Sequence, residues 1–169
     1  RAIGKGSIDY LVKWIPTFKT VLDFGCGNGL PALYLASRFP EVQVYGYDNN
    51  VEVISFAKWI SQRLDLNKID FSTKIPGKKC DIVLCLEVLE HFRNPLEFFE
   101  LELLKYVSKY LLLTCTFYRM WPGHYPYYLI DGRQTYRAIL QKIKNKLSDR
   151  VIVSKIGWNR HPILFEVKK

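Results

Sequence analysis

The sequence has few of the residues that build metal centres, and it has no long apolar run. It contains three histidines and four cysteines in 169 residues, and the cysteines do not form the two close pairs of a typical zinc site. No apolar run approaches the roughly 18 residues of a membrane span, and no signal-like stretch opens the chain. We therefore expect a cytoplasmic protein with reduced, structural cysteines, no transmembrane segment and no resident metal.

Apolar and aromatic residues, in contrast, make up 49% and 15% of the chain. A chain of this length and composition can bury a full core, and no repeat or linker divides it, so we expect one domain over residues 1–169. Strand and helix patterns alternate, which indicates an α/β fold with a mainly parallel sheet whose loops share one edge. After a first strand that begins at Val21, the expected strands cover 42–47, 68–72, 82–86, 110–116, 151–156 and 164–167, and the expected helices cover 32–39, 51–64, 95–107 and 133–147.

The most informative segment is the loop after the first strand, which has glycine at every second position from Gly25 to Gly29. Glycine has no Cβ and adopts positive φ, so such a loop lets a ligand lie against bare backbone. The next strand ends in Asp48, where a carboxylate can hold a ribose diol. A nicotinamide or flavin fingerprint would require a small residue at position 30, and that residue is Leu30. A nicotinamide-binding protein is therefore the weaker alternative.

The D-x-G-x-G-x-G pattern, followed by a strand and Asp48, resembles that of the class I S-adenosylmethionine (SAM) dependent methyltransferases. In that family the glycine loop packs against the methionine half of the cofactor, and backbone carbonyls and the acidic group meet its ammonium. The resemblance implies SAM as the cofactor and places its ribose on Asp48. The implied cofactor-binding residues are Asp23, Gly25, Cys26, Gly27, Gly29, Asp48, Asn49, Asp70, Phe71, Leu86 and Glu87.

A second motif, E-V-L-E-H, follows the apolar run 82–86 and resembles the fourth motif of the small-molecule methyltransferases. The resemblance implies that Leu86 and Glu87 border both the cofactor and the acceptor. The motif departs from the Asp/Asn-Pro-Pro-Tyr tetrapeptide of enzymes that methylate base amines, which disfavours adenine or cytosine as acceptor. The residue that meets the cofactor's adenine is left open, because Asp70 has the expected position but can point outward, which would leave Ser72 or Thr73 in that role.

The same resemblance implies a Rossmann-like sheet of seven strands, mainly parallel, with a C-terminal antiparallel hairpin and helices on both faces. It also implies a substrate-side insertion at about 117–148. The aromatic-rich stretch 117–128 lies there, and it forms either part of the acceptor pocket or a loop that packs on the core.

Methyl transfer from a sulfonium mainly requires that the acceptor atom be held close and in line, so a base is optional. His91 and His124 are the candidate bases if the acceptor must lose a proton. The expected acceptor is a small molecule. One alternative is a metal-dependent RNA 2′-O-methyltransferase, whose E-x-x-E-H arrangement would use Glu87, Glu90 and His91 with His124. A non-catalytic SAM-binding protein is the other.

The net charge of +9 is concentrated near the end of the chain. Residues 1–130 carry 15 basic and 13 acidic side chains, whereas residues 131–169 carry 10 and 3, which gives +2 and +7. The expected helix 133–147 is basic and amphipathic. It is either a solvated surface helix or an attachment site for an acidic partner such as RNA, a phosphorylated metabolite or a membrane surface. We expect a monomer or a homodimer.

Overall fold

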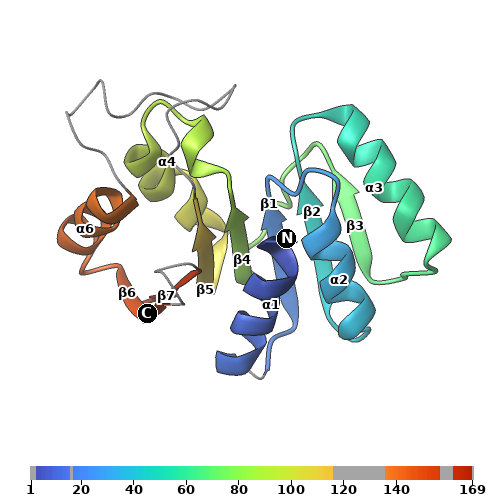
Figure 1. Cartoon of the computed structure of the whole chain (residues 1–169), viewed down its shortest axis with the longest axis horizontal. Coiled ribbons are helices and arrows are strands. Elements are labelled where there is room, and N and C mark those ends of the chain that lie inside the picture. Colours follow the sequence, from blue (N-terminus) through green and yellow to red (C-terminus); the bar gives the residue numbers. More distant parts are fainter. Residues whose placement is uncertain (1–2, 16, 116–135, 157–161, 169) are drawn as a thin grey trace.

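A computed structural model describes residues 3–15, 17–115, 136–156 and 162–168 (Figure 1). The helices are α1 Ile3–Trp14, α2 Leu30–Arg38, α3 Val51–Arg63, α4 Pro95–Leu101 and α6 Tyr136–Lys146, with short 3-10 turns at η1 Leu89–His91 and η2 Leu103–Tyr106. The strands are β1 Thr20–Phe24, β2 Gln43–Tyr47, β3 Ile69–Ser72, β4 Cys80–Leu86, β5 Val107–Thr114, β6 Val151–Ile156 and β7 Ile163–Val167. Among the helices in these ranges, none has the length and apolar character needed to cross a membrane.

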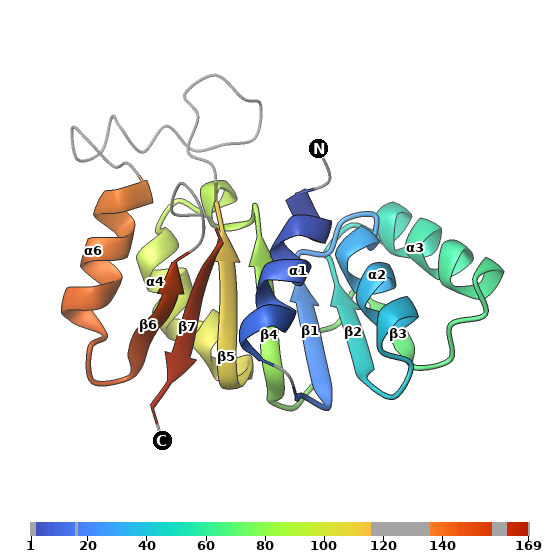
Figure 2. The same ribbon diagram turned by 60° about the horizontal axis from the view of Figure 1, so that its bottom comes forward.

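The seven strands form one sheet in the order β3-β2-β1-β4-β5-β7-β6. The first five are parallel, and β7 pairs antiparallel with both β5 and β6. Figure 2 shows that β1, β2, β4 and β5 point to the same edge. The predicted mainly parallel sheet with a C-terminal hairpin is confirmed. Since β1 lies between β2 and β4, the chain order switches direction at β1, and the crevice beside such a switch point is where open α/β sheets bind ligands.

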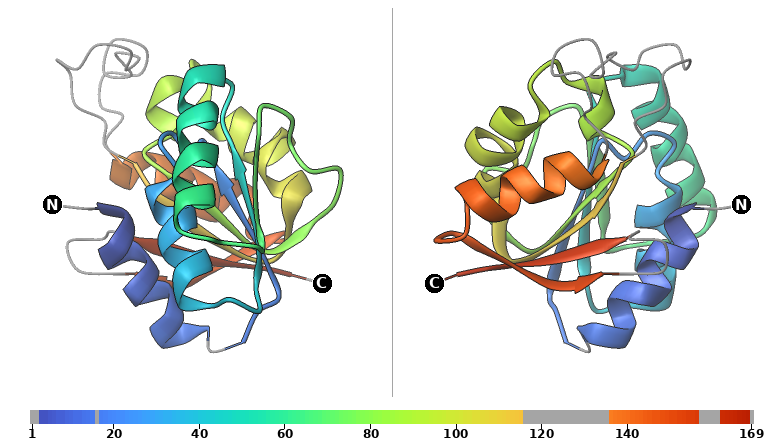
Figure 3. Two further views of the ribbon diagram at one scale, coloured as in Figure 1. Left: turned by 90° about the vertical axis from the view of Figure 1, so that its right-hand side faces the viewer. Right: turned by 60° about the vertical axis from the view of Figure 1, so that its left-hand side comes forward.

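Helices cover both faces of the sheet, and each face has its own core (Figure 3). Helices α1, α2 and α3 pack on one face through buried residues such as Ile8, Leu35 and Ala57. Helices α4 and α6 pack on the other face through Phe99 and Ile143. The central strands are apolar on both sides, as a doubly covered parallel sheet requires.

Two elements differ from the sequence-based expectation. Helix α1 was not expected, although Ile8, Leu11 and Ile15 repeat at helical spacing and are all buried. The helix expected at 95–107 ends at Leu101, and β5 begins at Val107 instead of residue 110. The reason is tertiary, because Val107 already pairs with Cys80 of β4 and so gains the hydrogen bonds of the sheet.

The connection from β3 to β4 consists of residues 73–79 and contains no helix. On the α4 face, the neighbouring strand β2 consequently keeps two half-buried aromatic side chains, Tyr45 and Tyr47, at the edge of the core. Tyr47 and Ile75, from β2 and from this connection, line the cavity described below.

Gly46 of β2 is packed so closely that a larger residue should destabilise the fold. It lies opposite Phe71 of β3, and a Cβ built on Gly46 would be 2.2 Å from Cδ1 of that ring. Phe71 is 2% exposed and cannot turn into solvent. We expect Gly46→Ala to lower the free energy of unfolding by about 1–3 kcal/mol, as overpacked cores do, in urea unfolding.

The matched control is the double variant Gly46→Ala/Phe71→Leu, in which the smaller side chain removes the contact. It should recover part of the stability lost in the single variant once the cost of Phe71→Leu alone is subtracted. Equal stability of Gly46→Ala and the unchanged protein would contradict this packing argument.

Candidate cofactor site

A cavity of about 550 Å³ opens at the carboxyl ends of β1, β2 and β4. Backbone of the glycine loop lines one side, at Gly25 and Gly27. The end of β2 contributes Asp48 and Asn49, and the segment after β4 contributes polar side chains that are described below. The site therefore lies at the switch point, between the two predicted motifs.

The glycine loop has the backbone conformation that its sequence predicts. Gly25, Gly27 and Gly29 have φ values of 70°, 52° and 79°. A Cβ on Gly25 would be 2.6 Å from a Val88 methyl, and one on Gly29 would be 2.7 Å from the Phe71 ring. A Cβ on Gly27 would have no protein atom within 4 Å, although Gly27 lines the cavity. Gly25 and Gly29 are therefore needed for packing, whereas Gly27 keeps a face of bare backbone open to a ligand.

Asp48 joins this loop to the end of β2. Its Oδ2 accepts a hydrogen bond of 3.0 Å from the Gly27 N–H, and its Oδ1 accepts one of 3.0 Å from the Asn50 N–H. Asn50 in turn caps α3 by accepting from the Glu52 N–H at 2.8 Å. The carboxylate is thus held in one orientation at the cavity wall. Each oxygen keeps lone-pair capacity for a ligand hydroxyl, because a carboxylate offers about four acceptor positions.

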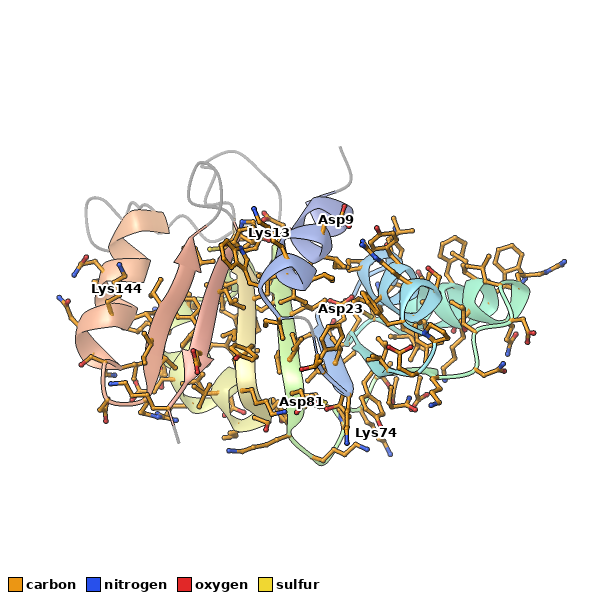
Figure 4. All side chains as sticks on the ribbon, turned by 90° about the horizontal axis from the view of Figure 1, so that it is seen from below. Asp9, Lys13, Asp23, Lys74, Asp81 and Lys144 are labelled. Carbon is orange, nitrogen blue, oxygen red and sulfur yellow. The ribbon has the colours of Figure 1, made fainter. Side chains whose placement is uncertain are left out.

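Asp23 of β1 is a buried carboxylate at 1% exposure, and it lies outside the cavity lining (labelled in Figure 4). The Ala32 backbone N–H donates to the carboxylate, but Oδ2 has no hydrogen-bond partner. The pKa of Asp23 is raised to about 7. Burial is the largest cause and the charge of Asp48 adds to it, whereas the hydrogen bond from Ala32 acts in the opposite direction. An orphaned carboxylate oxygen in an apolar environment favours a nearby cation.

Because the folded-state pKa of Asp23 is raised, its carboxyl stabilises the fold most when it is protonated. That contribution is complete below the unfolded pKa of about 4 and is lost as the pH rises through about 7. We expect stability to fall across this window by up to about 1.4 kcal/mol per pH unit from this group.

The check is urea unfolding of the unchanged protein and of Asp23→Asn at pH 4.5, 6 and 8. The variant cannot ionise at this position, so its stability relative to the unchanged protein should improve steadily with pH. Parallel profiles for the two proteins would contradict the assignment of a raised pKa to Asp23.

The segment after β4 is also constrained. Glu87 has a φ of 57°, which is unusual for a residue other than glycine, and its N–H donates to the Thr114 carbonyl at 2.9 Å. Such conformations persist where the surrounding structure enforces them, often at functional sites. Glu87 and His91 both line the cavity, whereas Glu90 between them is fully buried.

Other predicted site residues lie outside the cavity lining. Asp70 is exposed on the edge strand β3, and Phe71 is buried beneath the glycine loop. The Cys26 side chain is buried in the core, where burial raises the pKa of its thiol, and Leu86 packs on the α1 face. His124 and the aromatic stretch 117–128 lie outside the described residues.

The metal-dependent alternative requires a group of ligands that the described residues do not form. No three histidine, cysteine, aspartate or glutamate side chains among them are grouped so that they could hold a metal ion. Since His124 is not described, the full ligand set of that alternative stays a prediction.

One whole side of the cavity was not predicted from the sequence. Its lining includes Phe24, Tyr47, Phe98, Glu102 and Tyr106. The last three come from α4, η2 and the junction between them, which the expected continuous helix concealed. Side chains alternate between the two faces of a strand, so the sequence could have placed Phe24 and Tyr47 on the α4 face. It could not have shown that they line a cavity.

Comparison with known proteins identifies this architecture. A family model described as a methyltransferase domain matches residues 5–116. A putative methyltransferase, 235L, of Invertebrate iridescent virus 6 is 36% identical over 70 residues, which cover 41% of this chain and 26% of that protein. An (S)-tetrahydroprotoberberine N-methyltransferase of Eschscholzia californica is 32% identical over 81 residues, or 45% of this chain and 23% of that protein. The chain thus spans about a quarter of the length of these relatives.

Among solved structures, magnesium protoporphyrin IX methyltransferase of Synechocystis with bound SAM aligns with a TM-score of 0.73 and 22% identity. The alignment covers 99% of this chain and 78% of that one. At this identity the likeness establishes the fold, including the C-terminal hairpin.

Proposed function

Given that the chain belongs to the methyltransferase domain family, with the class I SAM-dependent fold, we propose that it transfers a methyl group from SAM to a small-molecule acceptor. The observation that carries the proposal is Gly27, whose bare backbone faces the cavity beside the fixed carboxylate of Asp48. This combination suits a ligand that has a ribose diol and, next to it, a group that must approach the protein backbone closely.

The residues present fit the cofactor at three points. Asp48 would accept hydrogen bonds from the ribose hydroxyls, and Gly25 and Gly27 would lie against the aminoacyl half. Asp23, near the end of the strand that leads into this loop, is not in the cavity lining, but a nearby positive charge of the cofactor would offset the burial of its unpartnered Oδ2. Asn49 would lie beside the nucleoside.

When bound, SAM supplies an activated methyl group, so the protein's task is chiefly to position the acceptor. Glu87 and His91 line the cavity next to the glycine loop, where an acceptor must approach. Either side chain could accept a proton from an acceptor that loses one. The role of His124 as a second base stays a prediction.

The test combines binding with turnover. Calorimetric titration should show that SAM and S-adenosylhomocysteine (SAH) bind and that nicotinamide dinucleotide does not. SAH production from SAM should then rise in the presence of an acceptor from a panel of amines, alcohols and phenols. Binding of the dinucleotide without SAM binding would overturn the proposal, and SAM binding with no turnover across the panel would favour a non-catalytic binding protein.

The basic C-terminal segment supports a second candidate, an RNA acceptor. Helix α6 exposes Lys142, Lys144 and Lys146, and Lys144 is labelled in Figure 4 on the outer side of that helix. Lys146 also pairs with Glu100 of α4 at 2.6 Å, so part of this charge is used within the fold. Methylation of a 3′-terminal RNA hydroxyl that responds to a divalent metal would favour the metal-dependent RNA enzyme over the small-molecule enzyme.

A further inference from the structure

The cavity has an acidic lining in a chain that is otherwise basic. The whole chain has 25 lysines and arginines against 16 aspartates and glutamates. The cavity lining has three carboxylates, Asp48, Glu87 and Glu102, and among the described residues neither lysine nor arginine contributes to it. A concave site with charge of one sign concentrates ligands of the opposite sign.

The part of the cavity beneath α4 is aromatic. The ring of Phe24 lies 4.9 Å from that of Tyr47, 5.5 Å from that of Phe98 and 6.2 Å from that of Tyr106, between centroids. Phe92, also in the lining, stacks on Phe98 at 3.7 Å. Burial, then the charge of Asp48 and the neighbouring Tyr106, raise the pKa of Tyr47, so its phenol stays neutral.

This aromatic end of the cavity lies next to the proposed cofactor-binding residues, but other residues form it. The glycine loop and Asp48 lie at the sheet edge, whereas Phe98, Glu102 and Tyr106 come from α4 and η2 on the sheet face. The connection after β3, which contains no helix, adds Ile75 to the lining. The carboxylate of Glu102 pairs with Lys105 at 2.9 Å, and its side chain remains 50% exposed, so it can accept a further donor.

We propose that this end of the cavity binds the acceptor, and that the acceptor is an organic amine with a flat apolar body. The inference rests on the proposed methyltransferase function and names its substrate class. Aromatic faces and a carboxylate together attract a cationic amine by cation–π and charge-assisted contacts. A phosphate or carboxylate ligand would instead meet Asp48 and Glu87 as like charges, with Glu102 partly neutralised by Lys105.

The chemistry balances for an amine. It enters as an ammonium and gives one proton to solvent or to Glu87, which frees the nitrogen lone pair. The lone pair then forms the bond to the methyl carbon as the carbon–sulfur bond breaks, and the electron pair of that bond stays on sulfur. The positive charge of the sulfonium moves to nitrogen, so the products are the methylated ammonium and the neutral thioether SAH.

The experiment compares two probes of one shape, 2-phenylethylamine and 2-phenylethanol, titrated into the protein with and without saturating SAH. We expect the amine to bind at least about tenfold more tightly than the alcohol. Glu102→Gln and Tyr106→Leu should each weaken amine binding by about three- to tenfold and leave the Kd for SAH within about twofold. Glu97→Gln, an exposed residue of α4 outside the lining, is the matched control and should change neither Kd.

Three results would overturn the inference: no amine binding at millimolar concentration, alcohol binding as tight as amine binding, or amine binding unchanged in both lining variants. A loss of SAH affinity equal to the loss of amine affinity would also overturn it, because the aromatic end would then belong to the cofactor. Failure of the unchanged protein to bind SAH would contradict the proposed function instead, and the titration without SAH would still decide whether the amine site exists.

Discussion

Gly27→Val should reduce SAM affinity at least about 100-fold, or about 2.7 kcal/mol, in a protein that remains folded. The new side chain has no protein atom to displace, because a Cβ at this position meets none within 4 Å. It would instead project into the cavity, in the part where we propose that the cofactor lies. The positive φ of 52° adds a backbone cost of about 1–2 kcal/mol, which a folded domain usually tolerates.

Two other glycines make this result interpretable. Gly77→Val changes a glycine that also has open space around it and is not a lining residue, so SAH affinity should be unchanged. Gly25→Ala should act differently, because its Cβ would lie 2.6 Å from Val88 and would disturb packing as well as binding. Calorimetry with SAH measures the effect on binding, and thermal unfolding measures the effect on packing. Unchanged SAH affinity in Gly27→Val would contradict the site assignment.

Asp48→Ala should also lower SAM affinity at least about 100-fold, since it removes the proposed acceptor for the ribose hydroxyls and leaves the Gly27 and Asn50 N–H groups without their partner. Asp48→Asn retains one amide oxygen, so we expect a smaller loss. The measurement is the Kd for SAH, with unfolding curves to verify that both variants fold.

Asp70→Ala is the matched comparison for Asp48→Ala. Both carboxylates belong to neighbouring strands, β3 and the end of β2, and both were predicted to contact the nucleoside. Asp70 is exposed and outside the cavity lining, so this variant should bind SAH with unchanged affinity. A loss as large as that of Asp48→Ala would restore Asp70 as the adenine contact. Unchanged affinity in Asp48→Ala would contradict the ribose assignment.

The predictions that depended on local sequence agree with the structure. The glycine loop, the strand that leads into it and the strand that ends before Asp48 were all predicted, because apolar periodicity and glycine conformation act within a few residues. The predicted end of the helix after β4 was wrong. Val107 pairs with Cys80, a residue distant in the sequence, and the local pattern of neither segment reveals this pairing.

By itself, the sequence determined the mainly parallel α/β fold and the pairing of a bare glycine loop with a carboxylate at one sheet edge. Both follow from short-range backbone preferences and from the single edge to which parallel strands point. Only the tertiary structure decided that Phe71 supports the loop, that Asp23 keeps an unpartnered oxygen, and that Glu102 joins an aromatic wall under α4. These features depend on side chains from distant segments that meet in three dimensions, and close packing, unlike periodicity, leaves no regular trace in the order of the residues.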